Sequence, residues 1–100
     1  MGKANIVLNH GILAITGELT RYSVADIENS EYVNWFVHSA VKVDLSKVSK
    51  ADTAGLAWML YLLEQAGHYS CQLSFSNVPE KLTKLITLSG VDGLLPITCD

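Results

Sequence analysis

The residues most able to do chemistry lie at the start of an apolar segment. Asp52 and Thr53 precede Gly55 and the apolar run over residues 56–63. Side-chain oxygens at such a place can accept hydrogen bonds from the first N–H groups of a helix. A hydroxyl there also suits a phosphate, because the helix dipole and the free N–H groups attract negative charge. We therefore interpret the pair as a helix cap in which Thr53 is a possible phosphorylation site.

Capping does not explain Gly55. Glycine inside a helix costs roughly 0.5–1 kcal/mol relative to alanine. Its use in the first turn suggests that another backbone segment, or a partner protein, approaches closely at this point. Capping and docking can coexist at one helix start.

Two aromatic residues of this helix lie away from its main apolar stripe. At about 100° per residue, the expected core stripe is Leu56, Met59, Leu60, Leu63 and Ala66. Trp58, Tyr61 and Gln65 lie on another side. An aromatic residue on an apolar helix is usually part of the core, but Trp and Tyr are also enriched at protein interfaces. The sequence thus predicts a partner-binding face made of Asp52, Thr53, Gly55, Trp58 and Tyr61.

No residue set supports catalysis or metal binding. His10, His38 and His68 fall on different predicted elements, without the spacing of a metal site or a nucleophile and its base. Cys71 and Cys99 do not form a CxxC pair, which favours two reduced thiols over a disulfide framework or a zinc site. A P-loop and a GxGxxG motif are absent. We expect no enzymatic activity, no cofactor and no metal, and we assign any ATP chemistry to a partner.

The elements that must position these residues begin with a hairpin. Residues 5–8 and 12–16 flank Asn9-His10-Gly11, a cluster that favours a tight turn. Ser23 offers an N-cap for a helix with a broken rhythm through residue 38. An interruption of that helix is expected near Asn29-Ser30.

Strands and helices then alternate. Alternating residues predict a strand over 41–45, and the motif helix follows and ends at Gly67. Another strand is expected over 71–76, and a helix beginning at Pro79-Glu80 and ending at Ser89-Gly90. Residues 94–97 form a last apolar segment, which Pro96 restricts to an edge strand.

This order predicts an α/β fold with a mixed sheet of four or five strands and helices packed on it. We expect the strand over 41–45 to lie centrally, because it feeds the motif helix. The chain has 100 residues, of which 49% are hydrophobic and 17% charged. That length suits one domain over residues 1–100 with a single core.

Three motifs, with the element order, resemble the STAS family, the sulfate-transporter and anti-sigma-antagonist domains. The motifs are TGEL at 16–19, VDLSKVSKADTAGLA at 43–57 and NVPEKLTKLITLSGV at 77–91. The resemblance covers almost the whole chain and implies a STAS-like fold. In the regulatory branch of the family, a kinase-like partner phosphorylates the hydroxyl residue of the second motif and thereby breaks binding. That residue corresponds to Thr53.

The second motif and the stand-alone length are most similar to a small cytoplasmic subunit of a bacterial ABC transporter. That transporter moves phospholipids between membranes and maintains the lipid asymmetry of the outer membrane. The resemblance implies a non-catalytic regulatory subunit that binds and supports the ATPase subunit. The alternative is a phosphorylation-regulated antagonist of an anti-sigma factor. A small-molecule carrier would need an enclosed pocket.

Charge and hydropathy restrict the partners and the location. A formal net charge of -3 with seven Lys and Arg argues against a nucleic-acid binder and favours protein partners. We expect no signal peptide, because Asn9-His10-Gly11 interrupts the first apolar run. The run over 56–63 is well short of the ~20 residues that span a bilayer. The expected location is cytoplasmic, at the inner face of the inner membrane when in complex, with only indirect membrane association.

Overall fold

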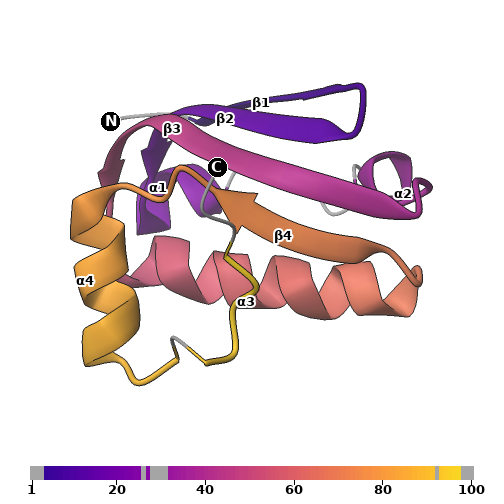
Figure 1. Ribbon diagram of the computed structural model, residues 1–100. Coiled ribbons are helices and arrows are strands. Elements are labelled where there is room, and N and C mark those ends of the chain that lie inside the picture. Colours follow the sequence, from indigo (N-terminus) through magenta and orange to yellow (C-terminus); the bar gives the residue numbers. More distant parts are fainter. Residues whose placement is uncertain (1–3, 26, 28–31, 92, 98–100) are drawn as a thin grey trace.

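The computed structural model describes residues 4–25, 27, 32–91 and 93–97. The elements follow in the order β1 (Ala4–Asn9), β2 (Ile12–Leu19), α1 (Arg21–Val24), α2 (Tyr32–Trp35), β3 (Ala40–Ala51), α3 (Thr53–His68), β4 (Gln72–Ser76) and α4 (Glu80–Leu88). They form a four-stranded sheet with helices packed on it, which confirms the predicted α/β architecture (Figure 1). None of the helices within the described ranges is long and apolar enough to cross a membrane.

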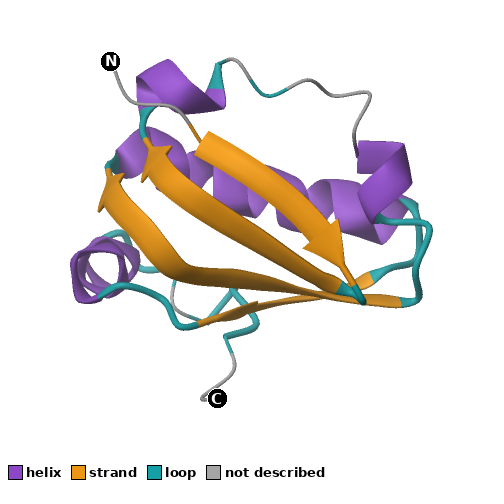
Figure 2. Cartoon of the chain, turned by 90° about the horizontal axis from the view of Figure 1, so that it is seen from above, coloured by secondary structure: helices purple, strands orange, loops and turns teal. Residues whose placement is uncertain are grey.

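The sheet has the strand order β1-β2-β3-β4. Strand β1 is antiparallel to β2, whereas β3 is parallel to both of its neighbours, β2 and β4. As expected, the strand that feeds the motif helix lies between two others. Helix α3 runs along one face of the sheet, and seen from the opposite side the strands lie in front of the helices (Figure 2). Among the described residues, that opposite face carries no helix.

The predicted opening hairpin is confirmed. His10 and Gly11 connect β1 to β2 and both have positive φ, 54° and 79°. Two positive values in a two-residue loop define a type I′ turn, whose twist matches that of the flanking strands.

The helix predicted from Ser23 to residue 38 is wrong in its start and extent. Helix α1 begins after Thr20, and the Ser23 hydroxyl accepts a hydrogen bond from the Thr20 N–H at 2.9 Å. Ser23 is thus the third residue of the helix and not its N-cap, because β2 reaches Leu19 and the chain turns immediately. Helix α2 is a separate single turn. The interruption predicted at Asn29-Ser30 lies outside the described residues.

Helix α3 does not end at Gly67 as predicted. It continues to His68, and Ser70 takes the left-handed conformation with φ of 55°. The Cys71 N–H then donates to the Ala66 carbonyl at 2.9 Å, which closes the helix end and starts the path into β4. The stop at Gly90 after α4 is confirmed by its φ of 72°.

The last predicted strand is reduced to a single bridge. Ile97 pairs with Phe75, and the Phe75 N–H donates to the Pro96 carbonyl at 2.8 Å. Proline has no N–H to donate, so the segment cannot extend a regular ladder. It nevertheless covers part of the outer edge of β4.

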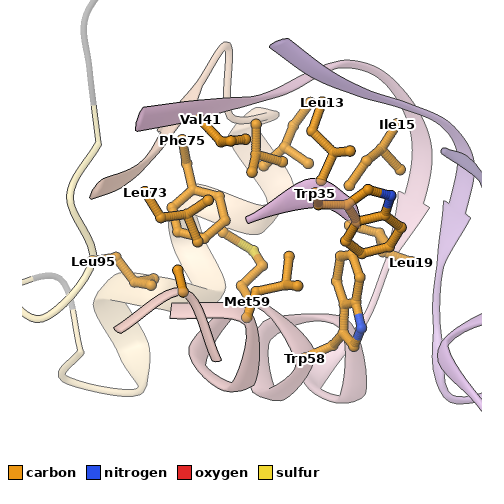
Figure 3. Close-up of a cluster of buried hydrophobic side chains, with 14 of the residues drawn as sticks. Leu13, Ile15, Leu19, Trp35, Val41, Trp58, Met59, Leu73, Phe75 and Leu95 are labelled. Atoms are coloured by element: carbon orange, nitrogen blue, oxygen red, sulfur yellow. The ribbon is translucent and has the colours of Figure 1, made fainter. Parts of the chain in front are cut away.

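The hydrophobic core lies between the sheet and α3. Figure 3 shows side chains of β2, β3 and β4 directed toward those of α3, with Met59 near the centre. The buried side chains of α3 are those of Leu56, Trp58, Met59, Leu62 and Ala66. Leu60 and Leu63, which we expected in the core stripe, are only half-buried, and Leu62 is completely buried instead. The side of the helix that we predicted to face the core is therefore partly wrong. Any side of an unbroken apolar run could face the core, and contacts with the sheet decide which one does.

Candidate partner-binding site

Asp52 is the N-cap of α3, as predicted. Its Oδ1 accepts hydrogen bonds from the N–H groups of Ala54 at 2.9 Å and Gly55 at 3.2 Å. Its Oδ2 accepts a hydrogen bond from the backbone N–H of Arg21 at 3.3 Å. The backbone N–H of Asp52 donates to the Leu19 carbonyl at 3.2 Å. One carboxylate therefore serves the starts of both α1 and α3. Such a cap is worth about 1 kcal/mol, and here it also fixes where the two helices begin.

Thr53 is the first residue of α3 and is exposed. Because Asp52 supplies the cap, the Thr53 hydroxyl is not needed for it. Within the described part of the chain, that hydroxyl has no hydrogen-bond partner. The side chain is therefore free to contact another protein or to accept a phosphate.

Gly55 is buried against the end of β2. A Cβ atom at this position would overlap with the Leu19 carbonyl oxygen and lie 3.0 Å from the Leu19 carbonyl carbon. The expectation that another backbone segment approaches here is confirmed, and that segment belongs to the same chain. Gly55 lets α3 and β2 pack closely, so its side-chain position is not available to a partner.

Trp58 is buried with 6% of its surface exposed, contrary to the exposed position that we expected. Its Nε1–H donates to the Tyr32 hydroxyl at 3.2 Å. Burial raises the pKa of Tyr32, although the hydrogen bond from Trp58 acts in the opposite direction. Tyr32 is therefore a neutral phenol that satisfies the indole N–H. The partner for Trp58 comes from α2, which the sequence did not link to α3.

Tyr61 remains accessible, with 38% of its surface exposed. Its ring packs edge-on against Tyr32, with the ring centroids 5.7 Å apart. That contact holds the ring in place without covering it. Tyr61 is thus a preordered aromatic side chain at the surface, as the sequence predicted.

Thr53, Ala57 and Tyr61 are exposed and spaced by four residues, so they lie along one side of α3. We call them the exposed stripe. An apolar groove of about 330 Å³ runs beside it, lined by Val24, Ile27, Tyr32, Ala54, Ala57, Trp58 and Tyr61. Ala54 and Ala57 were missed in the sequence, although small residues next to an exposed tyrosine at helical spacing are a usable signal. The groove is open to solvent, and both alanines line it.

The described residues of the site do not form a metal-binding cluster. In the described ranges, no three His, Cys, Asp or Glu residues lie close enough to hold a metal ion. The three predicted His positions also stay apart: His10 lies in the hairpin turn, His38 follows α2, and His68 ends α3. The exposed stripe and groove are suited to binding a partner surface.

A second groove, of about 760 Å³, lies where β2, β3 and β4 begin. It is open and has both apolar and polar residues in its lining, among them His10, Lys42, Gln72 and Pro96. It shares no lining residue with the groove beside the exposed stripe. Both grooves are open, unlike the enclosed pocket that a small-molecule carrier would need.

The fold resembles several solved structures at low sequence identity. The phosphorylated form of the Bacillus cell fate determinant SpoIIAA is 14% identical, with 97% of this chain and 92% of that chain covered and a TM-score of 0.64. An anti-sigma-factor antagonist domain protein from Planctomyces limnophilus is 12% identical, with 98% and 90% covered and a TM-score of 0.69. An anti-sigma factor antagonist from Mycobacterium paratuberculosis is 15% identical, with 100% and 87% covered and a TM-score of 0.63.

These similarities show the fold, and a family model adds sequence evidence. The model described as "Mlab, STAS domain" matches residues 3–96, which include the whole of α3 and its capping residue. The chain therefore belongs to the STAS domain family.

Proposed function

We propose that this chain is a non-catalytic subunit that binds and supports the ATPase of an ABC transporter for phospholipids. The observation that carries the proposal is the exposed stripe Thr53, Ala57 and Tyr61 beside an apolar groove, on a helix held in place by the Asp52 cap. The name Mlab in the matching family model supports the transporter branch of the family. In this role the chain acts in the cytoplasm, at the inner face of the inner membrane, and contacts the membrane only through the complex.

The geometry supports docking by a protein surface with one protruding apolar side chain. The two alanines leave room above α3, and Tyr61 and Tyr32 form the wall of the groove. Aromatic residues already held in their bound orientation lose little entropy on binding and often dominate interface energies. Asp52, Gly55 and Trp58 belong to the proposed site as positioning residues: Asp52 sets the helix start, Gly55 the packing on β2, and Trp58 the position of Tyr32.

Binding to the purified ATPase subunit tests the proposal. Thr53→Arg places a long charged side chain at the start of the exposed stripe and should weaken binding strongly. Tyr61→Ala should weaken it by about 5- to 30-fold, which corresponds to a loss of about 1–2 kcal/mol. The matched control is Thr87→Arg, on the exposed side of α4, which should leave binding unchanged. If affinity survives both α3 changes, the stripe is not the docking surface.

A second candidate function is a phosphorylation-regulated antagonist of an anti-sigma factor. The unpartnered hydroxyl of Thr53 at a helix start favours it, since a phosphate there meets the positive end of the helix dipole. The similar solved structures include anti-sigma factor antagonists and a phosphorylated form. Phosphate would then sit on the docking surface itself and oppose binding.

The two functions differ in their partner. The chain should bind the transporter ATPase and should take up no phosphate from an anti-sigma kinase with ATP, as followed by mass spectrometry of the intact protein. Phosphate on the wild type that is missing from Thr53→Ala, together with no affinity for the ATPase, would favour the antagonist.

A further inference from the structure

The two edge strands of the sheet, β1 and β4, differ in how far other parts of the chain cover them. At the β4 edge, the segment containing Pro96 and Ile97 pairs with Phe75 and covers part of the strand. At the β1 edge, the described residues make no main-chain hydrogen bond outward from the strand. An open strand edge is a template for pairing with another strand.

Strand β1 lacks the devices that usually protect an edge. Its six residues, Ala4–Asn9, include no charged residue and no proline. Its register with β2 is unbroken over the whole strand, whereas the pairing of β2 with β3 contains shifts. Natural edge strands are commonly protected by Lys, Pro or a bulge. Val7 is 61% exposed on this strand.

The hairpin turn defines which main-chain groups face outward. In a two-residue loop the flanking residues exchange both hydrogen bonds, so Asn9 faces β2, and by alternation so do Val7 and Asn5. The N–H and carbonyl groups of Ala4, Ile6 and Leu8 therefore point away from the sheet. These three residues offer a regular row of donors and acceptors.

We propose that β1 pairs with β1 of a second copy of this chain, antiparallel and about a two-fold axis at Ile6, which joins two sheets into one. In this register Ile6 pairs with Ile6 of the second copy, and Ala4 pairs with Leu8 in both directions. All the outward main-chain groups are then used. An antiparallel pair of identical strands is self-complementary, as a two-fold interface requires. The proposal does not rest on the proposed transporter function.

The side chains fit the same register. Asn5 and Val7 stand opposite Thr16 and Ala14 of β2, on the face without helices, while Ile6 and Leu8 stand opposite the buried Ile15 and Leu13. In the dimer Asn5 lies opposite Val7 of the second copy, in a pair without main-chain hydrogen bonds. Side chains are closest in such pairs. Within Ala4–Asn9 no charge is brought close to another, and Val7 contacts Asn5 of the second copy.

Pairing of two six-residue strands buries less surface than a stable protein interface, which buries at least about 1,200 Å². The association should therefore be weak and depend on concentration. Analytical ultracentrifugation up to about 1 mM protein covers this range of affinity. Amide hydrogen exchange measured by NMR at low and high concentration locates the surface: protection should rise at Ile6 and Leu8, and stay constant at Asn5 and Val7, which already bond to β2.

Charge exchange tests the register. The double variant Asn5→Lys/Val7→Lys places like charges opposite each other twice, and so does Asn5→Glu/Val7→Glu. Each should weaken self-association by at least about tenfold, because like charges directly opposite in a sheet repel. An equal mixture of the two should associate at least as strongly as the wild type. The control Leu88→Lys/Leu94→Lys changes two exposed leucines, at the end of α4 and in the segment that covers β4, at the opposite edge of the sheet, and should have no effect.

Thermal melts establish that each variant is folded. A wild type that stays monomeric up to about 1 mM would overturn the proposal. Self-association that both charged variants retain would also contradict it. The same holds if self-association leaves the hydrogen exchange of the Ile6 and Leu8 amides unchanged.

Discussion

Gly55 and Gly67 lie in the same helix but face different surroundings. At Gly55 an added Cβ would overlap with the Leu19 carbonyl oxygen, and at Gly67 it would meet no atom within 4 Å. Backbone cannot move aside as the end of a flexible side chain can. The sequence indicated that a glycine in the first turn of a helix requires an explanation. The structure provides one, because α3 packs closely on the end of β2 at Gly55.

We expect Gly55→Ala to destabilise the fold by about 1–3 kcal/mol, the usual cost of overpacking, despite the better helix propensity of alanine. Gly67→Ala should be neutral or stabilise by up to about 1 kcal/mol, because it only restricts the unfolded chain. Urea unfolding of both variants measures the difference. Equal effects of the two substitutions would contradict the role assigned to the Leu19 contact.

At the scale of elements, α3 has a buried side fixed by the sheet and an exposed side available to partners. Leu62 is completely buried and Leu60 only half-buried, although both lie in one apolar run. Trp58 is held on the buried side by the hydroxyl of Tyr32. This phase places Thr53, Ala57 and Tyr61 together on the outside.

Alanine substitution tests this phase. Leu62→Ala should lower the free energy of unfolding by about 2–5 kcal/mol, because it leaves a cavity in the core. Leu60→Ala should cost clearly less, since part of that side chain is already in water. Thermal or urea unfolding of the two variants is sufficient. A larger loss for Leu60→Ala would mean that the helix is rotated relative to the structure.

At the scale of the whole molecule, Asp44 connects β3 to the segment that follows β4. Its Oδ1 accepts hydrogen bonds from the Ser46 N–H at 3.0 Å and from the Asn77 side-chain N–H at 3.1 Å. These bonds, the Ser46 bond first, hold the pKa of Asp44 below its usual value of 3.8. A carboxylate with a lowered pKa in the folded state contributes stability that is present above the unfolded pKa and is lost as the pH falls through the folded one.

We therefore expect part of the acid sensitivity of the fold to come from Asp44, below about pH 4. Asp44→Asn should lose less stability than the wild type when the pH is lowered through that range. The difference should be small, because the group is close to solvent. Urea unfolding at a series of pH values measures it, and identical pH profiles for the two proteins would show that the Asp44 bonds do not contribute.

The sequence by itself determined the features that depend on neighbouring residues. The hairpin at His10-Gly11, the cap at Asp52, the stop at Gly90 and the alternation of strands and helices follow from local conformational preferences and hydrogen-bonding needs. The family could be recognised for the same reason, since its motifs are continuous in the chain. The cap at Asp52, the helix start at Thr53 and the exposure of Tyr61 also agree with the sequence, whereas their role in binding stays a prediction.

Only the tertiary structure decided which side of α3 is buried and what Gly55 and Trp58 contact. An apolar run has no polar residues to define a helical phase, so contacts with the sheet select it. The indole of Trp58 finds its acceptor on Tyr32, which is 26 residues away in the chain and on another helix. The periodicity of a helix depends only on the helix's own residues. Whether a residue is buried also depends on the surface that the helix packs against, and that surface forms only when the chain folds.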